Sequence, residues 1–173
     1  MTRPLHTAIY AALSISLSAY VAMAHALAPS DAGERTCWAR VYTNAHIRSH
    51  PGQEVKEMLV RLARPSAFPA QVSMLLRVRF QDEPSRLYLG SGTCRTEGSE
   101  TDCWIDGDGG RFTLEERSGG RIVLINNNAG GLALDREAIG GQRAIRRLTD
   151  HPQHGIFLLH RVDGSVCPDD WLG

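Results

Sequence analysis

The sequence predicts an all-β fold: a small antiparallel β-barrel or clam-like sandwich of about eight strands in a meander, stapled by disulfides and preceded by a signal peptide. Three observations lead to this prediction. Short segments of alternating apolar and polar residues recur along the chain. Seventeen glycines are available for the tight turns between them. Four cysteines, an even number in a chain that has an export signal, indicate two disulfides.

Residues 1–26 have the features of a secretory signal peptide. Arg3 gives the N-terminal segment a positive charge, and a largely apolar stretch runs from Ala8 to Ala24. Small-x-small cleavage sites follow at Ala22–Ala24 and Ala24–Ala26. The alternative is a membrane anchor, because the stretch approaches the roughly 20 residues that span a bilayer. Its three serines and the cleavage sites favour a signal peptide. We therefore expect a periplasmic or secreted protein without stable membrane insertion.

The remaining residues, 27–173, are expected to form a single β domain, since this length is sufficient for one core. Removing residues 1–26 takes away one arginine and no acid, which leaves 18 basic and 19 acidic residues and a net charge of −1. A near-neutral chain argues against a nucleic-acid partner held by phosphate neutralisation. It also argues against a polybasic membrane-surface protein.

The cysteines allow three pairings, of which we favour Cys94–Cys103 with Cys37–Cys167. Cys94 and Cys103 flank a polar loop of the kind that joins antiparallel strands. Cys37–Cys167 would tie the first strand to the C-terminal tail. Metal binding is the alternative, but the chain has no Cys-x-x-Cys and its cysteine spacings match no zinc template.

The strands are expected in chain order, separated by turn-forming residues. The clearest is 72–80, where five apolar side chains alternate with serine, leucine and arginine at a period of two. Glycine and Pro-Gly signals end most of the others. The expected strands are 36–43, 54–64, 72–80, 87–92, 102–106, 112–115, 121–126, 132–134 and 156–162.

Three segments are less clearly patterned. Residues 54–64 fit either a strand or one face of a helix, and we choose the strand. Residues 44–52 are expected to be a loop that ends at Pro51-Gly52. Residues 136–148 have a spacing that suits a short helix, but Gly140-Gly141 argues against it, and both readings stay open.

The histidines are the first candidate metal ligands. His46 and His50 have the spacing that places two imidazoles on one helix face, and imidazole suits zinc, copper or nickel. His151 and His154 form a second close pair. His50 and His151 each precede a proline, which disfavours the helical conformation, so the competing interpretation is exposed histidines in loops.

An acidic turn is a candidate calcium site. Asp102, Asp106 and Asp108 surround a glycine-rich stretch that resembles the start of a calcium-binding loop. The motif lacks a third oxygen ligand in sequence. The alternative is a hairpin turn in which the aspartates bond to their own backbone.

The sequence argues against an enzyme and predicts no cofactor. It has no Gly-x-Ser-x-Gly motif and no phosphate-binding glycine loop, and the predicted disulfides leave no free thiol. The three tryptophans lie near cysteines in the sequence, and we expect them to pack against the disulfides rather than line a ligand site.

One basic cluster is a candidate recognition site. Arg143, Arg146 and Arg147, near Arg136, would suit an acidic partner or a phosphate-bearing glycan, although such charges more often form a solvated face. The long polar segments 44–53 and 136–155 are the candidate recognition loops.

The cysteine and glycine pattern resembles that of a group of uncharacterised exported bacterial β-rich proteins. The resemblance covers most of residues 27–173, implies an exported β domain, and assigns no catalytic residues. The residues that show it are Cys37-Trp38-Ala39-Arg40-Val41-Tyr42, His46, His50-Pro51, Gly92-Thr93-Cys94, Cys103 and Gly109-Gly110-Arg111-Phe112.

Three functions compete at this point. The leading hypothesis is a non-enzymatic binding or interaction module whose partner is another exported or envelope protein, since loops on a rigid scaffold carry recognition. The second is a barrel that encloses a small apolar ligand, and bulky inward-facing residues would argue against it. The third is an enzyme, which would need a cleft with convergent polar groups.

Overall fold

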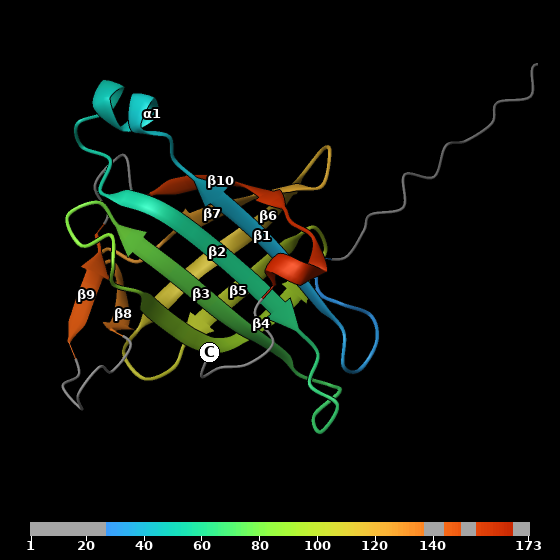
Figure 1. Cartoon of the computed structure of the whole chain (residues 1–173). Coiled ribbons are helices and arrows are strands. Elements are labelled where there is room, and N and C mark those ends of the chain that lie inside the picture. The colour runs from blue at the N-terminus through green and yellow to red at the C-terminus, as the bar shows by residue number, and fades with distance from the viewer. Residues whose placement is uncertain (1–26, 137–143, 150–154, 168–173) are drawn as a thin grey trace, which may run out of the picture.

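The structure is a computed structural model that describes residues 27–136, 144–149 and 155–167, and its strands close into an antiparallel barrel (Figure 1). The strands are β1 (Arg35–Val41), β2 (Val55–Ala63), β3 (Val72–Phe80), β4 (Tyr88–Glu97), β5 (Glu100–Ile105), β6 (Gly110–Arg117), β7 (Arg121–Asn126), β8 (Leu132–Arg136), β9 (Ile145–Leu148) and β10 (Ile156–Arg161). The two short helices are α1 (Asn44–Ser49) and the 3-10 turn η1 (Gly164–Val166).

The barrel is a meander with one insertion. Strands β1 to β7 pair in chain order, β10 pairs with both β7 and β1, and β3 pairs with β4, so eight strands close the ring. The β8–β9 hairpin lies between β7 and β10 in the chain and pairs with the first residues of β4, through Tyr88 opposite Arg136 and Leu89 opposite Asp135. The predicted barrel and its meander are confirmed, and the sandwich alternative is not.

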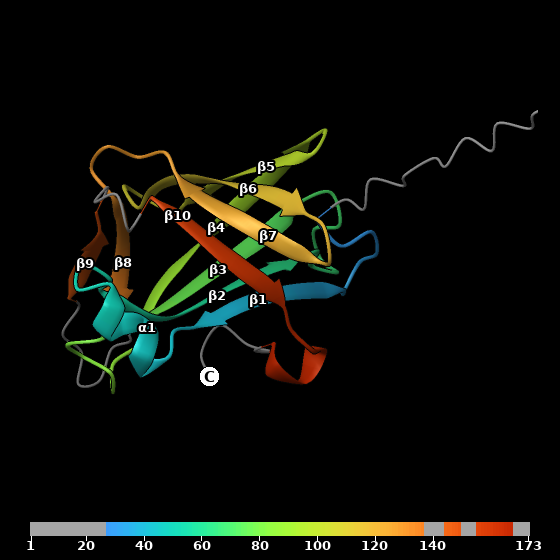
Figure 2. The same cartoon turned by 90° about the horizontal axis from the view of Figure 1, so that it is seen from above.

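The two ends of the barrel are built differently (Figure 2). At one end, which we call the helix end, α1 and the β8–β9 hairpin lie near the β3–β4 and β5–β6 connections. At the other, the lead-in end, residues 27–34 meet the β2–β3 loop and the short β4–β5 and β6–β7 turns. This difference matters because both cavities described below lie at or beside the lead-in end.

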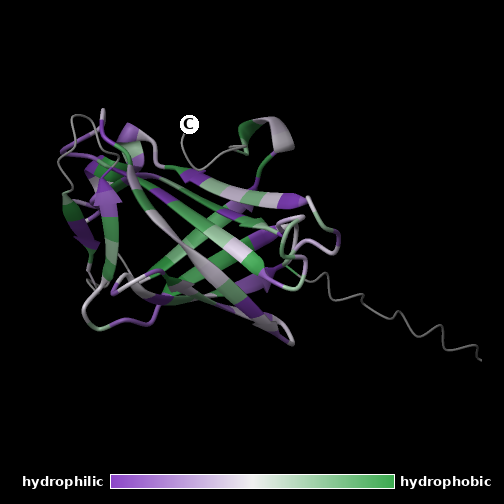
Figure 3. Ribbon diagram, turned by 90° about the horizontal axis from the view of Figure 1, so that it is seen from below, coloured by the Kyte–Doolittle hydropathy of each residue, from purple (hydrophilic) through white to green (hydrophobic). Residues whose placement is uncertain are grey.

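The inside of the barrel is filled by side chains. Apolar and polar residues alternate along the strands, as the bands of colour in Figure 3 show, and the inward-facing residues form one continuous core. Each fully buried large apolar side chain contributes about 1.5–3 kcal/mol. Leu132, Leu134 and Leu148 of the β8–β9 hairpin are also fully buried in this core. The expectation of a filled interior is confirmed.

Gly92 permits the closest approach between two strands of the barrel. A Cβ atom at this position would lie 1.8 Å from the carbonyl oxygen of Trp104 on β5. Because that oxygen belongs to backbone, it has little room to move aside. The position in β4 therefore requires glycine, which explains a residue that is otherwise unfavourable inside a strand.

One expectation about local structure was wrong, and one question that the sequence leaves open is answered. Residues 44–49 form helix α1 rather than a loop, because the Thr43 hydroxyl accepts a hydrogen bond from the His46 amide and caps the helix. The helix ends at His50, whose φ of −131° and ψ of 76° are not helical, as its position before Pro51 requires. The sequence leaves residues 136–148 open between strand and helix, and in the structure residues 145–148 are strand β9, which pairs with β8.

Both predicted disulfides are present. Cys94–Cys103 joins opposite residues of β4 and β5, and Cys37–Cys167 joins β1 to the residue after η1, 130 positions away in the sequence. On the outer face of β1 and β2, Cys37, Cys167 and Leu59 form a small separate apolar cluster, against which Ala39 and Val162 pack. The second disulfide therefore attaches the end of the described chain to the barrel wall.

Among the eight boundaries of the closed ring, the one between β1 and β10, which we call the β1–β10 seam, has the fewest register pairs. Within the described residues it has only two register pairs, whereas the β1–β2 boundary has seven. One further backbone bond, from the Val162 amide to the Cys37 carbonyl, measures 3.0 Å. The Cys37–Cys167 disulfide thus reinforces the boundary at which the barrel closes.

We expect removal of the two disulfides to have unequal effects on stability. In the chain-entropy description, cross-linking a loop as long as the one closed by Cys37–Cys167 stabilises by about 5 kcal/mol and a loop of about ten residues by about 3 kcal/mol. C37S/C167S should therefore lower the free energy of unfolding more than C94S/C103S does. Urea unfolding of both variants measures these free energies. Equal losses, or a larger loss in C94S/C103S, would contradict the prediction.

Candidate functional site

A groove on the outside of the barrel, the aromatic groove, is lined by residues of the β2–β3 loop and of strands β4 and β5. Its volume is about 580 Å³. Phe68 is 66% exposed and Trp104 is 43% exposed, although both are large apolar side chains. The lining residues are Ala67, Phe68, Pro69, Ala70, Gln71, Thr93, Cys94, Arg95 and Trp104.

The β2–β3 loop is held in shape by its own hydrogen bonds. The Phe68 amide donates to the Pro65 carbonyl at 3.1 Å, and the Gln71 amide donates to the Phe68 carbonyl at 3.0 Å. Arg64 donates from Nε to the Pro29 carbonyl at 2.8 Å and from Nη1 to the Pro69 carbonyl. Phe68 is therefore presented to solvent by a loop that is bonded on both sides.

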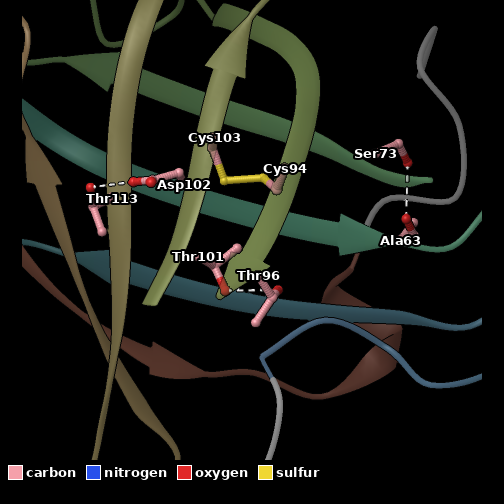
Figure 4. Close-up of a disulfide and its surroundings, with 8 residues drawn as sticks. All are labelled: Ala63, Ser73, Cys94, Thr96, Thr101, Asp102, Cys103 and Thr113. Atoms are coloured by element: carbon pink, nitrogen blue, oxygen red, sulfur yellow. Dashed lines mark hydrogen bonds between the residues drawn. A yellow bond between two sulfur atoms is a disulfide. The ribbon is translucent and has the colours of Figure 1, made fainter. Parts of the chain in front are cut away.

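Trp104 belongs to β5 of the β4–β5 hairpin, whose Cys94–Cys103 disulfide is shown in Figure 4. Its neighbours Cys103 and Ile105 are buried, so the alternation of a strand directs Trp104 outward. It lies opposite Thr93 on β4 and Arg111 on β6. The Cys94–Cys103 disulfide and a Thr96–Thr101 hydroxyl contact at 3.0 Å hold the hairpin together beside it.

The rim of the groove carries cations. Arg95 pairs with Glu97 at 3.1 Å, and both side chains are largely exposed. Arg111 is exposed and has no hydrogen-bond or ion-pair partner within the described residues. The groove thus has two exposed aromatic rings, and the exposed Arg111 lies beside it, opposite Trp104.

A second cavity lies at the lead-in end and has a volume of about 320 Å³. Its apolar part includes Leu27 and Trp38, which are nearly buried. Arg121 also lines it, but its Nε donates to the Ser118 carbonyl at 2.8 Å and so holds the β6–β7 turn. Charged residues of both signs, Glu34, Glu116 and Arg161 among them, share this cavity.

The structure brings His46 and His50 together but not in the arrangement of a metal site. Their rings stack at 4.1 Å between centroids with 15° between planes. A metal ion binds an imidazole nitrogen in the plane of its ring, and two parallel stacked rings do not direct their lone pairs at one point. Within the described residues no group of three or more histidine, cysteine or acidic side chains is placed to hold a metal ion. His151 and His154 lie outside the described residues.

A contact between Ser49 and His50 is not a catalytic pair. The hydroxyl of Ser49 lies 3.0 Å from Nδ1 of His50, but that same Nδ1 lies 2.9 Å from the His46 carbonyl. A carbonyl only accepts, so Nδ1 carries the proton and does not take one from Ser49. The Ser49 hydroxyl in turn bonds to carbonyls of its own helix. These contacts close the end of α1.

Among the described residues, the three aspartates of the candidate calcium site do not form a cluster that could hold a metal ion. Asp102 points outward from β5 and accepts a 2.8 Å hydrogen bond from the Thr113 hydroxyl (Figure 4). Asp106 follows β5 and lies 3.4 Å from the Ser91 hydroxyl, and Asp108 is exposed in the β5–β6 turn. The three carboxylates do not converge, and the described residues contain no such cluster. The glycine-rich turn of the alternative is present between β5 and β6, but the contacts of Asp102 and Asp106 are with the Thr113 and Ser91 hydroxyls rather than with their own backbone.

The basic cluster divides into residues with different contacts. Arg146 on β9 donates to both carboxylate oxygens of Asp82, at 2.7 and 2.9 Å, and lies 3.6 Å from Glu54. Its guanidinium also stacks over the Phe80 ring at 3.7 Å. Arg147 donates to the Gly130 carbonyl at 3.1 Å, and Arg143 lies outside the described residues. Arg146 therefore attaches the β8–β9 hairpin to the ends of β2 and β3.

The hydrogen bond from Arg146 holds the pKa of Asp82 below its usual value. A lowered pKa in the folded protein means that the contribution of this pair is present above the ordinary aspartate pKa. It is lost as the pH falls through the lowered value.

We expect R146M to loosen the β8–β9 hairpin by about 1–2 kcal/mol, because it removes the ion pairs and the cation–π contact while keeping a long apolar side chain. R147M is the matched control, since Arg147 donates to the carbonyl of Gly130, just before β8, and among the described contacts has none with Asp82 or Glu54. Hydrogen exchange at the amides of residues 132–136 measures the effect. Equal exchange rates in both variants would contradict the attachment by Arg146.

The chain matches no protein-family model, and neither a curated protein nor a solved structure matches it. Among the described residues there is no helix long and apolar enough to cross a membrane.

The aromatic groove is the feature that the sequence analysis missed. Trp104 was expected to pack against a disulfide, but it faces away from the barrel interior. The signal was available in the strand pattern, because Cys103 and Ile105 share one face and Trp104 takes the other. Phe68 carried no comparable signal, since its position depends on how the β2–β3 loop folds over the neighbouring strands.

Proposed function

We propose that this protein is an exported, non-enzymatic interaction module that binds an extended segment of another exported protein in the aromatic groove. The observation that carries the proposal is the pair of exposed rings, Phe68 and Trp104, over a groove on a rigid barrel. Aromatic side chains that anchor a partner bury about 150–250 Å² each, and tryptophan is among the residues enriched at binding hot spots.

The groove is preorganised for binding. The disulfide supports Trp104, and the loop hydrogen bonds support Phe68. Little ordering is therefore required when a partner binds, which favours affinity. The volume of about 580 Å³ lies within the range of ligand-binding sites.

The lining favours an extended segment that contains proline or aliphatic residues beside an acidic one. Aromatic-lined grooves bind preformed extended helices of the polyproline type, since these lose little conformational entropy. Arg111 offers a cation without a partner next to Trp104, and an acidic residue of the segment would neutralise it.

Other features support this proposal over the rivals. The filled interior disfavours a barrel that encloses a ligand. Of the three described histidines, His46 and His50 stack on each other and His160 bonds to Arg40, and these contacts do not form a nucleophile–base pair. Two disulfides are compatible with an oxidising compartment.

A displayed library of random peptides, selected against the oxidised protein, tests the proposal. Enriched peptides should carry proline or aliphatic residues next to Asp or Glu. Calorimetry with the best peptide should show at least a tenfold weaker affinity for F68A and for W104A. R111E should also weaken binding, because it reverses the charge that meets the acidic residue.

I156A is the matched control, because Ile156 is an equally exposed apolar side chain at the other end of the barrel. It should bind the peptide as tightly as the unaltered protein does. Peptides that bind W104A and the unaltered protein equally well, or a selection that enriches basic sequences, would sink the proposal.

A further inference from the structure

All three described histidines lie in one chain of contacts that runs from β10 across β1 to α1. Arg40 on β1 donates from Nη1 to Nε2 of His160 on β10 at 3.0 Å, and its guanidinium lies 5.1 Å from the Tyr42 ring centroid. The Tyr42 ring lies 4.9 Å from that of His46, which stacks on His50 at 4.1 Å. We call these five residues the histidine stack.

The histidine stack crosses the β1–β10 seam where backbone pairing has stopped. The last register pair of the seam is Ala39 with His160, one residue before Arg40. From there on, the Arg40–His160 hydrogen bond is the side-chain link between the two strands. At its other end the stack reaches α1 through His46 and His50, and Ile47 of α1 packs against the core to which Tyr42 belongs.

The protonation states of two histidines follow from their partners. A guanidinium only donates, so Nε2 of His160 accepts and its ring is neutral. Nδ1 of His50 donates to the His46 carbonyl, and a neutral His50 fulfils this role. A second proton on His160 would remove the acceptor that Arg40 uses. Protons on both His46 and His50 would place two cations in a stacked pair.

The groups that face the histidine stack are mostly cations. On β2 these include Lys56, and on β7 Arg121, which lies opposite His160. Lys56 Nζ donates to the Tyr42 carbonyl at 2.9 Å and to Asn44 Oδ1 at 2.7 Å. The nearest acid by strand register is Glu57, opposite Val41, and Arg79 pairs with it at 3.4 Å. Protonated histidines would therefore add to a positive surface.

We propose that the histidine stack is a pH-sensitive latch, which holds α1 and the adjoining β1–β10 seam in place at neutral pH and releases them in mild acid. The inference is independent of the aromatic groove, which lies on other elements.

The direction of the pH effect follows from His46. Desolvation first, and then the charges of His50 and Arg40, lower the pKa of His46. A histidine whose pKa is lower in the folded state favours the closed form while it is neutral. This stabilisation of the closed form is fully present above the ordinary histidine pKa of about 6.5. It decreases as the pH falls from that pKa toward the lowered pKa of His46.

Backbone dynamics of the ¹⁵N-labelled full domain test the latch. At pH 7.5 the amides of Ile47 and His50, which bond to Thr43 and Ile47 carbonyls, should have order parameters of about 0.85, as in rigid backbone. At pH 5.0 these should fall below about 0.6, while the amides of β2 and β3 stay rigid. Unchanged order parameters at Ile47 and His50 would overturn the proposal.

The variant H46Q/H50Q/H160Q separates titration from packing, because glutamine at 160 still accepts from Arg40 but does not gain a proton. Its α1 should have the same order parameters at both pH values. R48Q is the matched control: it removes a charge from α1 without removing an imidazole, and it should retain the pH response. A response that persists in the triple variant, or is lost in R48Q, would also contradict the latch.

Discussion

The closure of the barrel between β1 and β10 is the constraint on which the rest of the structure depends. Within the described residues this seam has two register pairs, whereas the other seven boundaries of the ring have between five and eight. It also joins segments that are far apart in the sequence, so closing it costs the most chain entropy. The Cys37–Cys167 disulfide and the Arg40–His160 hydrogen bond both reinforce this boundary, the first on the outer face and the second beyond the last backbone pair.

The side chains that fill the closed barrel limit where a binding site can lie. Large apolar side chains fill the interior, and the β8–β9 hairpin adds three more leucines at the helix end. The hairpin is attached there by Arg146, which meets Asp82 and Glu54. What is left for recognition is the outer surface and the lead-in end. The aromatic groove and the second cavity both lie in that region.

Much of the fold was predictable because it depends on local pattern. The period-two alternation of 72–80 required a strand, and the loop between Cys94 and Cys103 indicated a hairpin. Helix α1 was missed because its first turn depends on a single cap residue, Thr43. Strand β9 was left open because it is placed by pairing with β8 and by the contact of Arg146 with Asp82, 64 positions away. The candidate site was harder to predict from the sequence than the fold. The strand pattern places Trp104 outside, but nothing local places Phe68 beside the same groove.

Native-state hydrogen exchange of C37S/C167S tests most directly whether the β1–β10 seam controls closure. If it does, the amides of β1 and β10 will exchange through a partial opening of low free energy, while those of β2, β3 and β6 stay protected until global unfolding. If instead all strands exchange together, or β4 and β5 open first, the barrel does not depend on this seam, and the account is wrong.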